Sequence, residues 1–402
     1  MESGWGWINF SSKDRDRSLA IISVLKGKGV VDELGIGVSR DVISDSLFPG
    51  LSTIQTRAKY FLFTPIIVAR YRKDKPNITL VKYFQEKESE YLECMASTYR
   101  GKDENGIFGI TLDNAKSLQR KPSSIYWNGQ QVLGIIRNNL HNRSLRHYFE
   151  QNRNKVNPDH YSEEDVPDSS TDKSGISLEE KIIVSFDPKN INLTDSEAKY
   201  LIETMKLKLV DDNKDCLFLN LLVDYELGRK FLSCDSFYEF YKEYIDDISN
   251  ENLKKRVINA YNFSYYMYGA HLLYNLLLQE KIEDSQILEE YTEKFRLWLL
   301  DIKNVKYDHI NHLESLQEVK SKANKFVEDW VSSIKSGKSM DILKKLIEEQ
   351  EFKSKTGRAR LKKSKLPPEV FNRVWYGMKY QDYRFNQVKN ILTDIYKGLD
   401  LC

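Results

Sequence analysis

Residues 257–279 read VINAYNFSYYMYGAHLLYNLLLQ, the most apolar stretch of the chain. Polar side chains recur within this stretch, at Asn259, Asn262, Ser264, His271 and Asn275. Such groups are costly in the hydrocarbon core of a bilayer, so we predict a buried helix and not a membrane span. The five tyrosines of the stretch would cover all sides of this helix, and we expect them to form packed core with tethered hydroxyl groups.

Helical patterns dominate the sequence on both sides of this stretch. Apolar periodicity and helix-capping residues predict helices over 11–27, 39–47, 53–70, 79–99, 112–149 and 194–209, and over most of 225–300. Strand signals are few, with residues 182–185 as the main candidate. The sequence therefore predicts a mainly α, multi-helical protein with two lobes and few short strands.

The chain carries 61 basic and 59 acidic side chains, and they are unevenly distributed. The net charge is +8 for residues 1–158, −13 for residues 159–350 and +7 for residues 351–402. Two basic ends that fold together around an acidic middle would form one positive face, whose commonest ligand is a phosphate backbone. Residues 353–365 contain seven basic residues and no acid, a pattern that is also typical of a solvated loop.

Residues 152–177 have few apolar side chains and indicate an exposed linker or disordered loop. We therefore expect residues 1–151 to form an N-terminal helical domain that recognises DNA and its bases. Residues 178–350 would form an acidic, tyrosine-rich helical domain. Residues 351–402 would form a basic segment that packs back on the N-terminal domain.

Several function classes are disfavoured by what the sequence lacks. The first ten residues do not resemble a secretory signal, and the four cysteines are scattered without a C-x-x-C pair, so we expect a cytoplasmic protein with reduced thiols. No phosphate-binding loop, dinucleotide motif or zinc-protease motif occurs. His309 and His312 have the spacing of two metal ligands, but a third ligand is not evident. We predict neither a metal nor an organic cofactor.

A dense polar cluster lies on two predicted helices that the Pro49-Gly50 turn would bring back toward each other. It includes Arg40, Asp41, Asp45, Ser52, Gln55, Arg57 and Tyr60. Gln55 can both donate to and accept from a base edge, Tyr60 offers a stacking face, and Asp41 or Asp45 could orient a water molecule. The alternative is structural, with Ser52 and Gln55 as helix caps and Asp41 paired with Arg57.

A second group, at residues 120–127, combines basic residues and hydroxyl groups with two aromatic residues. Arg120 would contact phosphate at a helix N-terminus, while Tyr126 and Trp127 would stack on an extruded nucleotide. Aromatic residues at helix starts are, however, more often part of the core.

Short motifs at both ends of the chain resemble those of a bacterial family long described as a domain of unknown function. The N-terminal motifs are GWGWINFS (4–11), DR (14–15), DELG (32–35), RD (40–41), LFPG (47–50), ST (52–53), QTR (55–57) and YFLF (60–63). The C-terminal motifs are RARL (358–361) and YRF (383–385). The likeness spans nearly the whole chain and is weakest in the middle.

This family is associated with anti-phage loci and with DNA glycosylases that excise glucosylated hydroxymethylcytosine from phage genomes. The resemblance thus implies an enzyme that flips a modified base from double-stranded phage DNA and leaves an abasic site. We assign the catalytic carboxylate to Asp41 and the base pocket to Gln55 and Tyr60. The predicted DNA contacts are Arg40, Arg57, Arg120, Tyr126, Trp127, Arg358, Arg360, Lys362, Lys363 and Arg384.

A different class of function remains open. The basic ends would also suit a non-catalytic DNA-binding or adaptor subunit, whose acidic middle docks a protein partner from the same defence locus.

Overall fold

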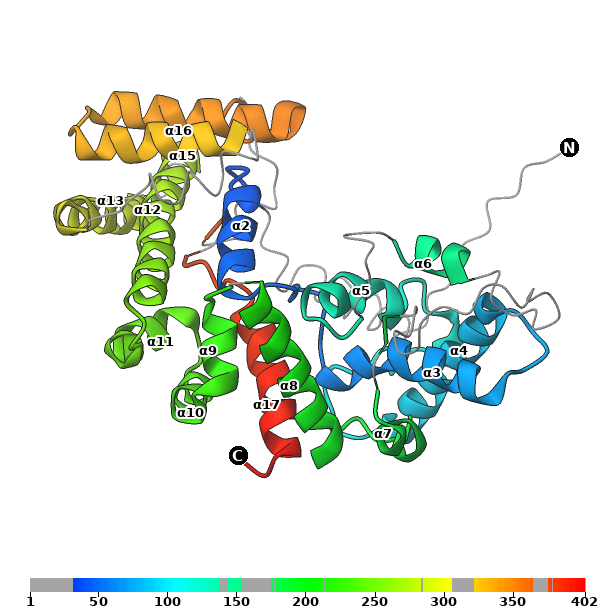
Figure 1. The fold of residues 1–402 in the computed structure, drawn as a ribbon. Helices are drawn as coiled ribbons and strands as arrows, with labels where there is room; N and C mark the ends of the chain where they lie inside the picture. The colour runs from blue at the N-terminus through cyan, green and yellow to red at the C-terminus, as the bar shows by residue number, and fades with distance from the viewer. Residues whose placement is uncertain are drawn as a thin grey trace, which may run out of the picture. The chain divides into compact units, whose positions relative to one another are not determined.

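The computed structural model describes the ranges 32–136, 144–152, 175–176, 178–212, 214–282, 285–305, 322–363, 375–377 and 379–401. Within these ranges the chain forms α-helices and short 3-10 helices and contains no β-strand (Figure 1). The mainly α, multi-helical fold is therefore confirmed. The helix predicted over residues 11–27 lies outside the described ranges.

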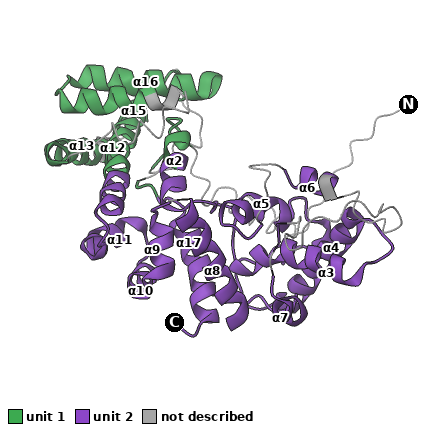
Figure 2. Cartoon of the chain, viewed as in Figure 1, with its two compact units in different colours: residues 1–40, 262–381 green, residues 41–261, 382–402 purple. Residues whose placement is uncertain are grey.

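The chain divides into two compact units, each built from two separate stretches of sequence (Figure 2). The first unit contains residues 1–40 and 262–381, and the second contains residues 41–261 and 382–402. The boundaries fall inside α2 (Gly37–Leu47) and α12 (Glu251–Ile282). They do not coincide with the expected boundary at residues 152–177, because that prediction followed side-chain polarity, whereas the units follow packing contacts.

The second unit contains most of the helices. They are α3 (Phe63–Asp74), α4 (Leu80–Tyr99), α5 (Pro122–Val132), α6 (Leu145–Asn152), α7 (Glu180–Ser185), α8 (Asp195–Asp211), α9 (Leu217–Val223), α10 (Tyr225–Ser233), α11 (Phe237–Tyr244) and α17 (Phe385–Gly398). Helix α3 packs against α4, and α8 lies beside α17 (Figure 1). The C-terminal helix α17 also contacts η1 (Ala58–Leu62), so residues from both ends of this unit's sequence pack in its core.

Two helices, α8 and α4, begin where the sequence predicts. The Thr194 hydroxyl accepts a hydrogen bond from the Glu197 backbone N–H at 3.4 Å, and the Glu197 carboxylate accepts one from the Thr194 N–H at 2.8 Å. This reciprocal capping box starts α8. Thr79 caps α4 in a simpler way, by accepting from the Lys82 N–H.

Three local predictions are wrong. The helix expected over residues 53–70 is replaced by an irregular stretch, then η1, then α3. Pro65 has no N–H to donate to residue 61, so it fits the first turn of α3 but not the interior of a longer helix. Residues 182–185 belong to α7 and not to a strand. The block expected over 112–149 is also interrupted, with α5 and α6 as its α-helices.

The first unit includes the C-terminal part of α12. Among the described residues its other α-helices are α13 (Ser285–Asp301), α15 (Lys322–Lys335) and α16 (Met340–Lys355), and α15 lies beside α16 (Figure 1). Trp330 is fully buried, and its indole N–H donates to the Tyr266 carbonyl at 2.9 Å. No described helix, α12 included, is both long enough and apolar enough to cross a membrane.

Gly269 on α12 provides a test of this packing. A Cβ atom at Gly269 would lie 2.1 Å from Cζ2 of Trp298, whose indole N–H donates to the Tyr265 carbonyl at 3.1 Å. We expect Gly269→Ala to lower the free energy of unfolding by at least about 1 kcal/mol, because overpacking outweighs the higher helix propensity of alanine. Urea denaturation followed by tryptophan fluorescence measures this change. Gly357→Ala is the control, because its Cβ would meet no atom within 4 Å, and equal stability of the two variants would contradict the packing.

Candidate nucleic-acid interface

Gln55 makes its side-chain hydrogen bonds to the backbone of residues 50 and 52. Its side-chain oxygen accepts from the Ser52 N–H at 3.0 Å, and its side-chain nitrogen donates to the Gly50 carbonyl at 3.2 Å. The residue is only 2% exposed. The structural alternative therefore describes Gln55 better than the base-pocket prediction, because both its polar atoms already have backbone partners.

Tyr60 also lies in the core. It is fully buried, and its hydroxyl oxygen accepts from the Phe108 N–H at 3.0 Å. The rings of Phe63, Phe108 and Tyr126 lie within 4.7–5.8 Å of its ring centroid. Burial raises the pKa of the Tyr60 hydroxyl. Its faces are covered by other aromatic side chains, so the prediction that Tyr60 stacks on a base is not supported.

The aromatic residues at the start of α5 are structural as well. Tyr126 is fully buried, and its hydroxyl accepts from the backbone N–H groups of Thr56 and Arg57 and donates to the Arg57 carbonyl. Trp127 is 6% exposed. Of this predicted group, Arg120 is exposed. The hydroxyl network explains the position of Tyr126, because it satisfies three backbone groups where residues 56 and 57 are not helical.

Arg57 was predicted to contact phosphate, but its guanidinium is already bound by protein carboxylates. Its Nε lies 3.0 Å from both carboxylate oxygens of Asp394, and its Nη1 pairs with Glu104. Burial lowers the pKa of Arg57, but the hydrogen bonds and charges of Asp394 and Glu104 more than offset this and raise it. With these partners, Arg57 stabilises the fold.

A second buried ion pair lies two residues further along. The Lys59 amine is 2.7 and 2.8 Å from the Glu197 carboxylate oxygens, and both side chains are at most 1% exposed. Burial lowers the pKa of Lys59 despite the attraction of Glu197. Sequence reasoning missed this role of Glu197 and the role of Asp394. The only available signal was the capping-box position of Glu197, which does not predict a distant lysine.

The predicted catalytic residue Asp41 lies on α2 and is half-buried, as is Arg40. One turn further along the helix, Asp45 is exposed, and its Oδ1 lies 2.5 Å from Nη1 of Arg384. The same nitrogen of Arg384 donates to the Leu51 carbonyl. The Arg384 guanidinium already binds protein acceptors, so its predicted role as a phosphate contact is not supported.

The basic residues between 353 and 363, in the first unit, fall into an inward group and an outward group. Arg360 points inward, with its Nη1 2.7 Å from Glu33 and its guanidinium carbon 4.7 Å from the centroid of the Tyr376 ring. This geometry makes Arg360 an anchor and corrects its predicted role as a phosphate contact. Arg358, Lys362 and Lys363 are exposed. These three outward cations are termed the basic patch.

Buried carboxylates hold this segment in place. The backbone N–H groups of Arg360 and Leu361 donate to Glu351 at 2.8 and 2.9 Å. Glu351 is fully buried and also accepts from the Tyr274 hydroxyl at 2.7 Å. Because Glu33 and Glu351 bind Arg360 from different parts of the sequence, the DELG and RARL motifs meet in this unit. The sequence carried no signal for this pairing beyond the resemblance itself.

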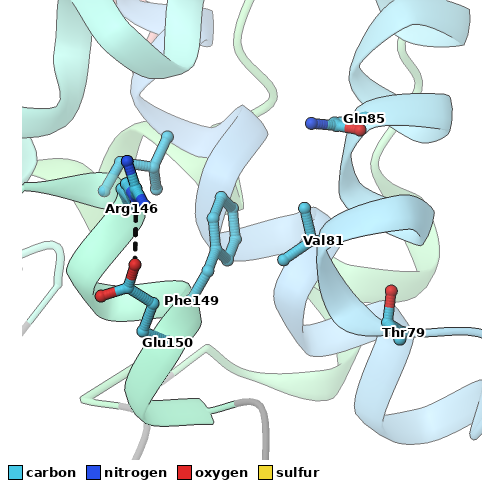
Figure 3. Close-up of a pocket in the computed structure, with 7 residues that line it drawn as sticks. Thr79, Val81, Gln85, Arg146, Phe149 and Glu150 are labelled. Carbon is cyan, nitrogen blue, oxygen red and sulfur yellow. Dashed lines mark hydrogen bonds and ion pairs between the residues drawn. The ribbon is translucent and has the colours of Figure 1, made fainter.

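A pocket of about 550 Å³ lies between the start of α4 and α6 (Figure 3). Its lining residues are Thr79, Val81, Gln85, Leu145, Arg146, Phe149 and Glu150. Arg146 and Glu150 form an exposed ion pair, and none of the lining residues is a predicted site residue. His309 and His312, whose spacing is that of two metal ligands, lie outside the described ranges.

The buried ion pair of Lys59 predicts a specific loss of stability. We expect Glu197→Gln to lower the free energy of unfolding by about 3–5 kcal/mol, because it leaves the Lys59 charge buried without a countercharge. Asp195→Asn is the matched control on α8, since Asp195 is 58% exposed in its pair with Lys199 and should contribute less than about 1 kcal/mol. Urea denaturation compares the two variants. Similar small effects would mean that Lys59 does not need Glu197.

The relationship of the chain to known proteins is narrow. No curated protein and no solved structure matches it. One family model, described as "Family of unknown function (DUF6361)", matches residues 2–293, which is most of the chain. The chain therefore belongs to the Family of unknown function (DUF6361).

Proposed function

We propose that the protein is a cytoplasmic anti-phage DNA glycosylase. It would flip a glucosylated hydroxymethylcytosine out of double-stranded phage DNA and hydrolyse its N-glycosidic bond, leaving an abasic site. The substrate and the reaction are what the motif resemblance implies. The structural observation that best supports a DNA substrate is the basic patch of Arg358, Lys362 and Lys363.

The basic patch has two properties that suit phosphate binding. Its side chains are exposed, while the neighbouring Arg360 is neutralised by Glu33, so the outward charge is available to an external anion. The backbone between its members is also fixed, because the N–H groups of Arg360 and Leu361 donate to Glu351, and this reduces the entropy lost when DNA binds. Contacts of this kind give affinity that does not depend on sequence and falls steeply with salt.

The chemistry of base removal requires a carboxylate near the sugar. Asp41 would stabilise the oxocarbenium-like sugar and position the attacking water, by analogy with glycoside hydrolysis. The reaction consumes one water and needs no metal or organic cofactor. Arg120, exposed at the start of α5, remains available for a phosphate contact.

Base release from glucosylated DNA tests the activity. We expect the purified wild-type chain to make alkali-labile sites in glucosylated phage DNA and to release a glucosylated base detectable by mass spectrometry. Asp41→Asn should abolish both without unfolding the protein, whereas Asp103→Asn, which changes an exposed carboxylate in the same unit, should not. Intact DNA after incubation with wild type would reject the glycosylase. Tight DNA binding without base release would favour the adaptor subunit instead.

The basic patch predicts a change in the salt dependence of DNA binding. Neutralising Arg358, Lys362 and Lys363 together should reduce the slope of log K against log salt by about two to three, because each phosphate contact contributes about 0.9. Fluorescence anisotropy at several salt concentrations measures the slope. The matched control neutralises three other exposed lysines of the same unit, Lys325, Lys338 and Lys345. Equal slopes for the two triple variants would place the DNA elsewhere.

A further inference from the structure

The two partners of the Asp45–Arg384 ion pair differ in their exposure to solvent. Nη1 of Arg384 lies 2.5 Å from Oδ1 of Asp45 and 2.5 Å from the carbonyl oxygen of Leu51. The Arg384 side chain is 10% exposed, whereas the Asp45 side chain is 63% exposed. A buried guanidinium therefore orients a carboxylate that remains accessible to solvent and to a ligand.

The backbone that carries Arg384 is unusual. Tyr383 and Arg384 have φ values of +47° and +65°, so two consecutive non-glycine residues adopt the left-handed conformation just before α17. This conformation is strained for residues with a Cβ atom. It is held in place because the Tyr383 hydroxyl donates to the Ala260 carbonyl at 2.6 Å and its ring packs against Phe237.

Fold stability does not account for this arrangement. Ion pairs with an exposed partner contribute little to stability. The Nε atom of Arg384 is buried and has no hydrogen-bond partner among the described residues, which is a further cost. Strain and an unsatisfied polar atom that occur together, around a carboxylate kept at the surface, are typical of functional sites.

Asp45 also has a second carboxylate beside it. Asp41 precedes it by four residues on α2, so the two side chains lie on the same face of the helix, with Cβ atoms about 6 Å apart. Hydrolysis of a glycosidic bond commonly uses two carboxylates, one of which activates water. With Asp41 assigned to the oxocarbenium-like sugar and to the position of the water, the exposed and oriented Asp45 is placed to accept the proton of that water.

We propose that Asp45 is a catalytic residue that activates the attacking water, and that Arg384 is its positioning residue. This inference rests on the proposed glycosylase function and adds a second carboxylate to it. The water oxygen bonds to C1′ of the flipped nucleoside while the C1′–N bond breaks and its electron pair goes to the base. The water proton passes to Asp45 and then to solvent, and the released base takes a proton from solvent, so that one water is consumed.

Kinetics on glucosylated DNA test the two roles. Asp45→Asn should lower kcat by about 10²–10⁴-fold with little change in KM, as for loss of a general base. Arg384→Lys should retain more activity than Arg384→Gln, because lysine keeps a cation beside Asp45. Asp235→Asn is the control, since Asp235 is 97% exposed and pairs with Lys389 at 3.9 Å in the same unit. An unchanged kcat in Asp45→Asn would overturn the inference.

A binding measurement tests Asp45 independently of turnover. The probes are two DNA duplexes in which one nucleoside is replaced by a cationic pyrrolidine or by a neutral tetrahydrofuran. The wild-type chain should prefer the cationic duplex by at least tenfold, and Asp45→Asn should lose this preference while Asp235→Asn keeps it.

The outcomes of this measurement separate the two proposals. A preference that depends on Asp45, in a protein that releases no glucosylated base, would reject the proposed substrate and support the catalytic carboxylate. A wild-type chain without the preference, or Asp45→Asn with it, would overturn the inference even if base release is observed.

Discussion

The buried charges at residues 57–59 set the main constraint on the larger unit. Arg57 and Lys59 can leave water only if carboxylates meet them, because an unpaired buried charge costs several kcal/mol. Those carboxylates come from distant elements: Asp394 on α17, Glu104 after α4, and Glu197 on α8. The buried cations at the start of η1 are therefore stable only when all three carboxylates are in place. This requirement connects residues that are 337 positions apart in the sequence.

The basic side chains of the protein differ in whether a carboxylate of their own unit binds them. Arg57 and Arg360 point toward carboxylates of their own units and contribute to structure. Lys362 and Lys363 are exposed and remain available to an external anion. A count of basic residues in a segment cannot separate these two groups. Their separation depends on where carboxylates from other segments lie after folding.

The geometry around α2 has a different physical origin. Asp45 is exposed on α2, and Arg384, which follows another residue in the left-handed conformation, directs its guanidinium toward this carboxylate. Tyr383 accepts this strain because its hydroxyl and ring are both anchored. The arrangement brings an accessible carboxylate, a fixed cation and a neighbouring Asp41 together within one unit.

Local signals in the sequence are enough to predict two of the helices. An amphipathic pattern predicts residues 79–99 and a capping residue predicts the start of 194–209, and α4 and α8 confirm both. A short apolar run such as 182–185 carries no periodicity that distinguishes helix from strand, so only packing decided it. The pairing of Arg57 with Asp394 follows from tertiary packing. The two residues are 337 positions apart, and no sequence pattern near either one indicates that folding buries them together.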